Sequence, residues 1–171
     1  IHASTDEVYG ESMLDADEKH KTEQSVLCPT NPYAATKASA ELIAQSYNHS
    51  FSMPIVISRG NNVYGPNQYP EKVIPRFIEQ LKAGKPVTIQ GDGSCVRAFL
   101  HSRDTATAFQ CILERGKIGE IYNIGGGRYS NCSIIEALNL VEEIAEIKEN
   151  RKILKNPRVG DHIWYISDTS K

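Results

Sequence analysis

The chain has 171 residues, of which 40% are hydrophobic and 23% are charged, and its formal net charge is −2. This balance argues against a nucleic acid or an anionic membrane as a partner, and no apolar run approaches the ~20 residues that span a bilayer. The four cysteines have no metal-ligand or redox spacing such as Cys-x-x-Cys. We therefore expect no metal site and a reducing, cytoplasmic location.

At each end of the sequence, the residues predict a secondary-structure element that is only partly present. The chain begins at Ile1 without a methionine, in what reads as the end of a strand, and it ends at Lys171 after residues that could open another helix. We therefore expect a fragment of a longer protein.

Taken in chain order, the sequence predicts strands that alternate with helices. Residues 11–31 are polar and proline-containing and are expected to form a loop, as are residues 59–70. Thr30 or Asn31 can cap the first helix, in which Ala34, Ala38 and Leu42 form a small-residue face for packing on a sheet. The predicted strands are 1–4, 54–58, 87–90, 96–100, 121–124, 153–154 and 164–166, and the predicted helices are 32–50, 71–83, 103–115 and one capped by Ser133.

This alternation indicates an α/β protein with a largely parallel sheet. In such sheets, ligands bind beyond the carboxyl ends of the strands. Polar clusters follow three of the predicted strands, at residues 4–7, 59–62 and 123–127. We expect the functional site at this edge.

Tyr33 and Lys37 lie four residues apart in the first predicted helix, so both side chains share one face. A neighbouring ammonium lowers the pKa of a phenol, which would allow Tyr33 to act as a general base. The alternative is a half-buried tyrosine beside a solvated lysine.

Asp6 and Glu7 follow the first strand and could meet the start of the Tyr33 helix. Adjacent carboxylates at a strand end can be a solvated turn. They can also supply an acid and a base whose environments drive their pKa values apart. Elimination needs that combination, since one group removes a C–H proton and another protonates the leaving hydroxyl.

Three motifs in order resemble the nucleotide-sugar 4,6-dehydratases, in the extended short-chain dehydrogenase/reductase family. They are Ser-Thr-Asp-Glu-Val-Tyr-Gly at 4–10, Pro-Thr-Asn-Pro-Tyr-x-x-x-Lys at 29–37, and Asn-Asn-Val-Tyr-Gly-Pro-Asn-Gln-Tyr-Pro-Glu-Lys-Val-Ile-Pro at 61–75. The resemblance implies the C-terminal part of a Rossmann-type parallel sheet domain with an interleaved small substrate-binding domain. Residues 1–60 and 100–124 would belong to the NAD-binding part, and 61–99 and 125–171 to the substrate-binding part.

The same resemblance implies an NAD-dependent mechanism on dTDP-glucose or UDP-glucose. Tyr33, assisted by Lys37 and Thr5, would take the proton of the sugar 4-hydroxyl while hydride leaves C4 for NAD. Glu7 would remove the C5 proton, Asp6 would protonate the departing C6 hydroxyl, and hydride would return to C6. The implied cofactor-binding residues are Ser4, Tyr33 and Lys37.

Substrate contacts implied by the family are Asn62, Arg97, Asn123 and Arg158. The segment 158–165 departs from the family's Arg-Pro-Gly-His-Asp-x-Arg-Tyr, because it reads Arg-Val-Gly-Asp-His-Ile-Trp-Tyr. The family pattern that the resemblance links to recognition of the nucleotide end is therefore altered in this chain.

Two other functions stay open. One is a 4-epimerase or decarboxylase of the same superfamily, against which Asp6 and Glu7 argue, and the other is a non-catalytic protein that binds sugar nucleotides. The family also implies a homodimer. Since the sequence has no glycine-rich dinucleotide turn, we expect the fragment alone to bind NAD weakly or not at all and to be inactive.

Overall fold

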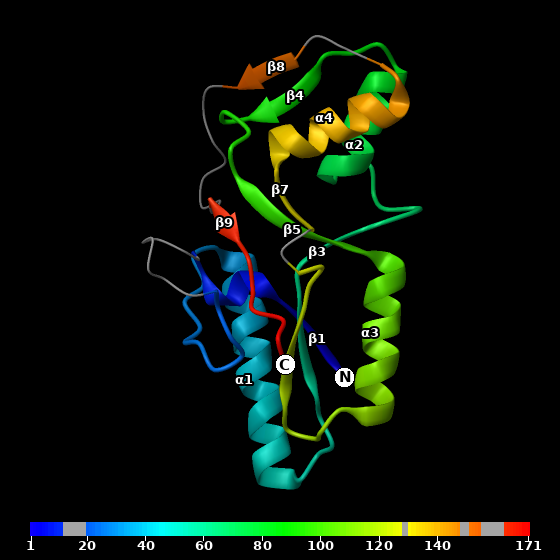
Figure 1. Ribbon diagram of the computed structural model, residues 1–171. Coiled ribbons are helices and arrows are strands. Elements are labelled where there is room, and N and C mark those ends of the chain that lie inside the picture. The colour runs from blue at the N-terminus through cyan, green and yellow to red at the C-terminus, as the bar shows by residue number, and fades with distance from the viewer. Residues whose placement is uncertain (12–19, 128–129, 148–150, 155–162) are drawn as a thin grey trace.

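The computed structural model describes residues 1–11, 20–127, 130–147, 151–154 and 163–171, and it is an α/β protein (Figure 1). The strands within these described ranges form three sheets. The first is parallel, with the order β1-β2-β6, and joins β1 (His2–Thr5), β2 (Ile57–Gly60) and β6 (Ile121–Ile124). Thr5 pairs with Gly60, which pairs with Ile124, so the three carboxyl ends meet at one edge.

The described residues form two further sheets. β5 (Val96–His101) is flanked by β3 (Asn62–Tyr64) and β9 (Trp164–Tyr165) in parallel and by β7 (Asn131–Ser133) in antiparallel orientation. β4 (Val87–Gln90) pairs in parallel with β8 (Arg151–Leu154). The expected α/β class with a parallel sheet is therefore confirmed.

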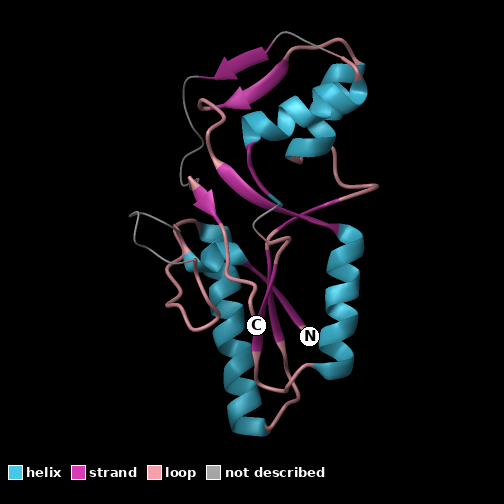
Figure 2. Ribbon diagram, viewed as in Figure 1, coloured by secondary structure: helices cyan, strands magenta, loops and turns pink. Residues whose placement is uncertain are grey.

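Helices cover the parallel sheet from two sides. α1 (Pro32–Phe51) and α3 (Ser102–Arg115) lie on opposite sides of it, whereas α2 (Val73–Lys82) and α4 (Ile134–Ala145) lie together with β4 and β8 at the other end of the molecule (Figures 1 and 2). A short 3₁₀ helix, η1 (Asp6–Tyr9), directly follows β1. No helix in the described part of the chain is long and apolar enough to cross a bilayer.

Local signals explain where two helices begin. Asn31 caps α1, because its Oδ1 accepts a hydrogen bond from the Ala34 backbone N–H at 2.8 Å. Ser133 caps α4 and forms a reciprocal capping box with Glu136, which satisfies two otherwise unpaired backbone donors. Both predicted caps are confirmed.

The packed face of α1 differs from the prediction. Ala34 and Ala38 are buried as expected, but Leu42 is 59% exposed and Glu41 is fully buried instead. The reason is that the Arg59 side chain of β2 bonds to the Glu41 carboxylate on this face.

A further expectation about strands is wrong. Residues 59–70 are not all loop, because Arg59 and Gly60 complete β2 and Asn62–Tyr64 forms β3, which pairs with β5. The glycine turn at 91–93 connects strands of different sheets, since β4 pairs with β8 and β5 pairs with β3, β7 and β9.

Two apolar clusters hold the ends of the molecule. One joins α2, α4 and β4 and consists of Phe77, Leu81, Val87, Ile89 and Leu138. The other packs α3 against the parallel sheet and consists of Val56, Leu100, Ile112 and Ile124. The carboxyl edge of the parallel sheet lies between them, next to η1 and the start of α1.

Candidate active site

The two carboxylates of the candidate site, Asp6 and Glu7, directly follow β1. They lie in η1, which the Thr5 side chain caps. Thr5 precedes η1, and its Oγ1 accepts a hydrogen bond from the Glu7 backbone N–H at 3.3 Å. The same hydroxyl donates to Oδ1 of Asp6 at 3.2 Å. This turn buries Asp6, with 4% of its surface exposed, and leaves Glu7 partly accessible.

Asp6 has an unusual proton affinity for a carboxyl group. Burial raises its pKa to about 6, and the negative charge of Glu7 acts in the same direction. Hydrogen bonds from Asn61 and Thr5 and the positive charge of Arg97 oppose this rise. Near neutral pH, a part of the Asp6 population is therefore protonated and able to donate a proton.

Glu7 is tied to the start of α1. Nδ2 of Asn31 donates to Oε2 of Glu7 at 3.1 Å, while Oδ1 of the same side chain accepts from the Ala34 backbone N–H and so caps the helix. Tyr33 lies two residues further on, and the charges of Glu7 and Asp6 both act on it. The structure thus brings Thr5, Asp6, Glu7 and Tyr33 to one place, as the sequence predicts.

The expected effect of Lys37 on Tyr33 is wrong for the described structure. The pKa of Tyr33 is raised, first by partial burial and then by the charges of Glu7 and Asp6. Lys37 lies on the same helix, but its Nζ donates to the Ala3 backbone oxygen of β1 at 2.7 Å. Tyr33 as a whole exposes 55% of its surface.

The other predicted site residues are placed as follows. Arg97 is buried on β5, donates to the Val96 carbonyl oxygen at 2.9 Å, and acts on Asp6 through its charge. Asn62 is half-buried at the first position of β3. Ser4 lies on β1, and its Oγ is a buried atom with no hydrogen-bond partner among the described residues. Arg158 lies outside the described residues.

Asn123 is engaged within the protein. Its Oδ1 accepts from the Tyr9 hydroxyl at 2.6 Å, and its Nδ2 donates to the backbone oxygens of Lys21 at 3.2 Å and Asp168 at 2.8 Å. These bonds join β6 to η1 and to the C-terminal segment. A substrate contact by Asn123 would have to compete with them.

Two residues next to the site are not among those predicted. Arg59 is buried beside Glu41 and Tyr9, and Asn61 donates to Asp6 at 2.7 Å. For Arg59 a signal was present, because a charged residue directly after an apolar strand needs a buried partner. For Asn61, the signal is its place in the polar cluster at 59–62, which directly follows a predicted strand.

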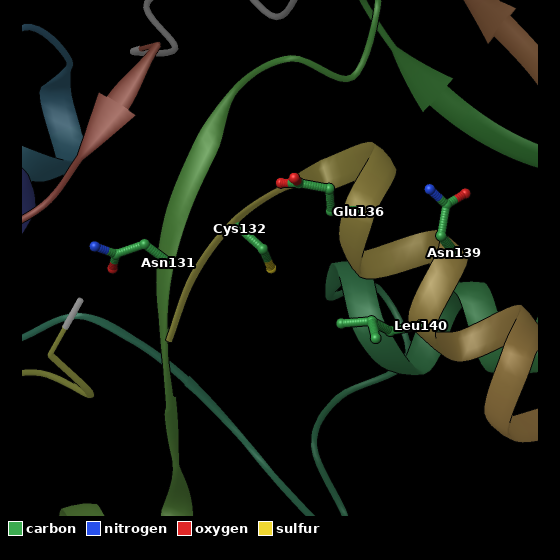
Figure 3. A pocket seen from close by; sticks show the side chains of 5 residues that line it. All are labelled: Asn131, Cys132, Glu136, Asn139 and Leu140. Carbon is green, nitrogen blue, oxygen red and sulfur yellow. The ribbon is translucent and has the colours of Figure 1, made fainter. Parts of the chain in front are cut away.

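A separate shallow pocket lies between β7 and α4 (Figure 3). Its volume is about 330 Å³, and it contains none of the predicted site residues. The lining residues are Asn131, Cys132, Glu136, Asn139 and Leu140. Within the described ranges, no group of three or more His, Cys, Asp or Glu side chains could hold a metal ion.

Known proteins match this chain closely. The model of the NAD dependent epimerase/dehydratase family matches residues 1–125. A trifunctional UDP-glucose 4,6-dehydratase/UDP-4-keto-6-deoxy-D-glucose 3,5-epimerase/UDP-4-keto-L-rhamnose-reductase of Arabidopsis thaliana is 44% identical over 98% of this chain and 25% of its own length. The human dTDP-D-glucose 4,6-dehydratase is 51% identical over 73% of this chain and 35% of its own length. The resemblance seen in the three motifs is confirmed.

Solved structures agree. A dTDP-glucose 4,6-dehydratase from Streptomyces venezuelae with NAD bound has a TM-score of 0.90 and 36% identity, over 98% of this chain and 50% of that one. A UDP-glucuronic acid 4-epimerase from Bacillus cereus with NAD and UDP-glucuronic acid bound has a TM-score of 0.89 and 34% identity, over 99% of this chain and 52% of that one. The expected Rossmann-type fold is confirmed, and the chain spans only about half of these solved chains and less of the curated relatives.

Proposed function

Because the chain belongs to the NAD dependent epimerase/dehydratase family, we propose that the full-length protein dehydrates a nucleoside-diphosphate glucose to its 4-keto-6-deoxy sugar. The observation that carries this proposal is the pair of unlike carboxyl groups beside Tyr33. Asp6 is buried with a pKa of about 6, whereas the adjacent Glu7 is partly accessible. An elimination needs one protonated and one ionised carboxyl group at the same centre.

Each of these residues has a step in the proposed reaction. Tyr33 takes the proton of the sugar 4-hydroxyl. Glu7 removes the proton at C5, which the 4-keto group has made acidic, and Asp6 gives its proton to the C6 hydroxyl, which leaves as water. Glu7 then returns its proton to C5 when hydride reaches C6, so the net change is the loss of one water. A bound NAD would supply the hydride acceptor for C4 and, once reduced, the hydride donor for C6. Because the pKa of Tyr33 is raised in the described structure, we propose that its phenolate forms only in the complex.

The residues around β1 fit a bound cofactor. The buried Ser4 hydroxyl has no partner among the described residues, and the Lys37 ammonium lies at the same strand, bonded to the Ala3 oxygen. Ser4, Lys37 and Tyr33 are the side chains that would hold NAD there. We assign residues 1–60 and 100–124 to the NAD-binding part and residues 61–99 and 125–171 to the substrate-binding part.

Substrate and assembly complete the proposal. Arg97 and Asn62 would contact the sugar nucleotide, and a guanidinium suits a diphosphate because it donates two parallel hydrogen bonds. The names of the relatives include both dTDP-glucose and UDP-glucose enzymes, so either nucleotide fits this family. We also propose a homodimer through α1, whose exposed apolar side chains include Leu42, Ile43, Tyr47 and Phe51.

Mass spectrometry of the sugar nucleotide tests the proposal. Full-length protein with NAD should convert dTDP-glucose or UDP-glucose into a product lighter by one water. An epimerase, the second candidate in view of the epimerase among the similar structures, would leave the mass unchanged. Binding without any product would indicate a non-catalytic protein.

A further inference from the structure

The Asn61 side-chain amide donates a hydrogen bond to the Asp6 carboxyl group, and the proposed reaction does not use it. We propose that Asn61 is a positioning residue, whose side-chain amide holds the Asp6 carboxyl group in the orientation from which it protonates the leaving hydroxyl. This inference rests on the proposed dehydration and adds a residue that acts through Asp6 rather than on the substrate.

The fold places Asn61 beside Asp6 by strand register. Asn61 lies between the last residue of β2 and the first residue of β3, and its backbone N–H donates to the Ile124 oxygen at 2.9 Å. Gly60, directly before it, pairs with Thr5, directly before Asp6. The two side chains therefore leave neighbouring parallel strands at the same level.

The contact between Asn61 and Asp6 is short and buried. Nδ2 of Asn61 donates to Oδ2 of Asp6 at 2.7 Å, and the two residues expose 5% and 4% of their surfaces. Thr5 bonds to the other oxygen, Oδ1. Each carboxyl oxygen thus has its own donor, which fixes the plane of the group. Because both residues are almost fully buried, solvent has little access to replace such bonds.

The Asn61 amide has room because Gly125, directly after β6, has no side chain. A Cβ atom added to Gly125, just after β6, would lie 2.3 Å from Oδ1 of Asn61. That oxygen is buried and has no hydrogen-bond partner among the described residues. The Asn61 amide is therefore held by Asp6 on one side and by the close approach of Gly125 on the other.

The same contact balances the charge at Asp6. Burial and Glu7 favour the protonated acid, whereas Asn61, Thr5 and Arg97 favour the carboxylate. Tyr33 on α1 also faces this group, since the charge of Asp6 acts on it. The bond from Asn61 is the largest of the influences that favour the carboxylate. Losing it should therefore strengthen proton binding at Asp6 about tenfold, which moves its titration to higher pH by about one unit.

Asn61→Leu in the full-length protein is the direct test, because leucine has a similar volume and no hydrogen-bonding group. Gly125→Ala is the second variant, since it displaces the amide without removing it. Gln68→Leu is the matched control, because the Gln68 amide bonds to the Val63 oxygen on the exposed side of the same segment. Single-turnover formation of reduced nicotinamide reports the first step, and loss of water reports the second.

In the Asn61→Leu and Gly125→Ala variants, we expect the first step to persist, the elimination to slow about tenfold, and its decline at high pH to move upward by about one pH unit. Gln68→Leu should behave as the wild type. An unchanged pH profile, or an equal loss of both steps, would overturn the inference. An inactive wild type would instead refute the proposed function. Titration of the Asp6 carboxyl carbon by NMR tests the contact apart from activity, because its midpoint must move in Asn61→Leu.

Discussion

Arg59 and Glu41 form a buried ion pair between β2 and α1, with Nη2 of Arg59 2.6 Å from Oε2 of Glu41 and exposures of 2% and 0%. Nε of Arg59 donates to both carboxylate oxygens at 3.1 Å, and Nη1 donates to the Tyr9 hydroxyl at 2.8 Å. The guanidinium therefore joins the helix that carries Tyr33 to the turn that carries the two carboxylates. Its integrity should decide how firmly those elements stay together.

Glu41→Leu should strongly destabilise the protein. The substitution leaves the Arg59 charge buried without its carboxylate, which costs about 3–5 kcal/mol in comparable sites. Thermal unfolding of the full-length protein measures the effect. The control is Glu120→Leu. It removes the ion pair between Glu120 and Lys171, which is equally short at 2.6 Å but is exposed to solvent. Glu120→Leu should leave the melting temperature near that of the wild type, and equal shifts in both variants would contradict the prediction.

Leu138→Ala tests the apolar cluster at the far end of the molecule. Leu138 is fully buried between α2, α4 and β4, so the substitution opens a cavity and should lower the free energy of unfolding by about 2–5 kcal/mol. Leu140→Ala in the same helix is the matched control, because 52% of Leu140 is exposed. Denaturant unfolding followed by circular dichroism measures both. A similar loss in the two variants would speak against this core.

Local chemistry allowed much of this fold to be predicted. The caps at Asn31 and Ser133 were predictable because each depends on residues within one turn of its helix. The approach of Asp6 and Glu7 to the start of the Tyr33 helix was predictable because both residues directly follow a strand, at the end of the sheet where ligands bind. In each case the information lies in a short segment or in a general rule of sheet geometry.

The contacts that were missed join residues far apart in sequence. Asn61 meets Asp6 across 55 positions, and Arg59 meets Glu41 across 18. β3 exists because it pairs with β5, and nothing within Asn62–Tyr64 indicates that partner. The raised pKa of Tyr33 has the same origin, because it depends on burial in the folded chain and then on the charges of Glu7 and Asp6 rather than on the spacing to Lys37.

Glu7→Gln should separate the two halves of the proposed reaction. Without a base for the C5 proton, elimination stops, yet Tyr33 can still assist oxidation at C4. We therefore expect reduced nicotinamide to accumulate on the enzyme, measured by its absorbance after the sugar nucleotide is added. Tyr33→Phe is the contrasting variant, since it should prevent that absorbance from appearing. Normal turnover by Glu7→Gln would remove Glu7 from its proposed step.

Asp6→Asn should increase stability at neutral pH while it abolishes water loss. The pKa of Asp6 is raised from 3.8 to about 6 in the folded protein. At a pH between these two values, the folded protein therefore still holds a proton on Asp6 that the unfolded chain has already released. Stability contributed by Asp6 is therefore full below pH 3.8 and is lost as pH rises through about 6. Asparagine cannot ionise, so the advantage of the variant should grow by roughly 3 kcal/mol between acidic and neutral pH.

Melting temperatures of both proteins across this pH range test the sign. The advantage of Asp6→Asn should be small near the acidic end and largest above the folded-state pKa of about 6. Asp92→Asn is the contrasting variant, because hydrogen bonds from Ser94 lower the pKa of the exposed Asp92. A carboxyl group with a lowered pKa stabilises the fold at higher pH, so Asp92→Asn should gain nothing there. A pH-independent difference between Asp6→Asn and the wild type would show that burial does not hold a proton on Asp6, which would remove the main support for Asp6 as the acid.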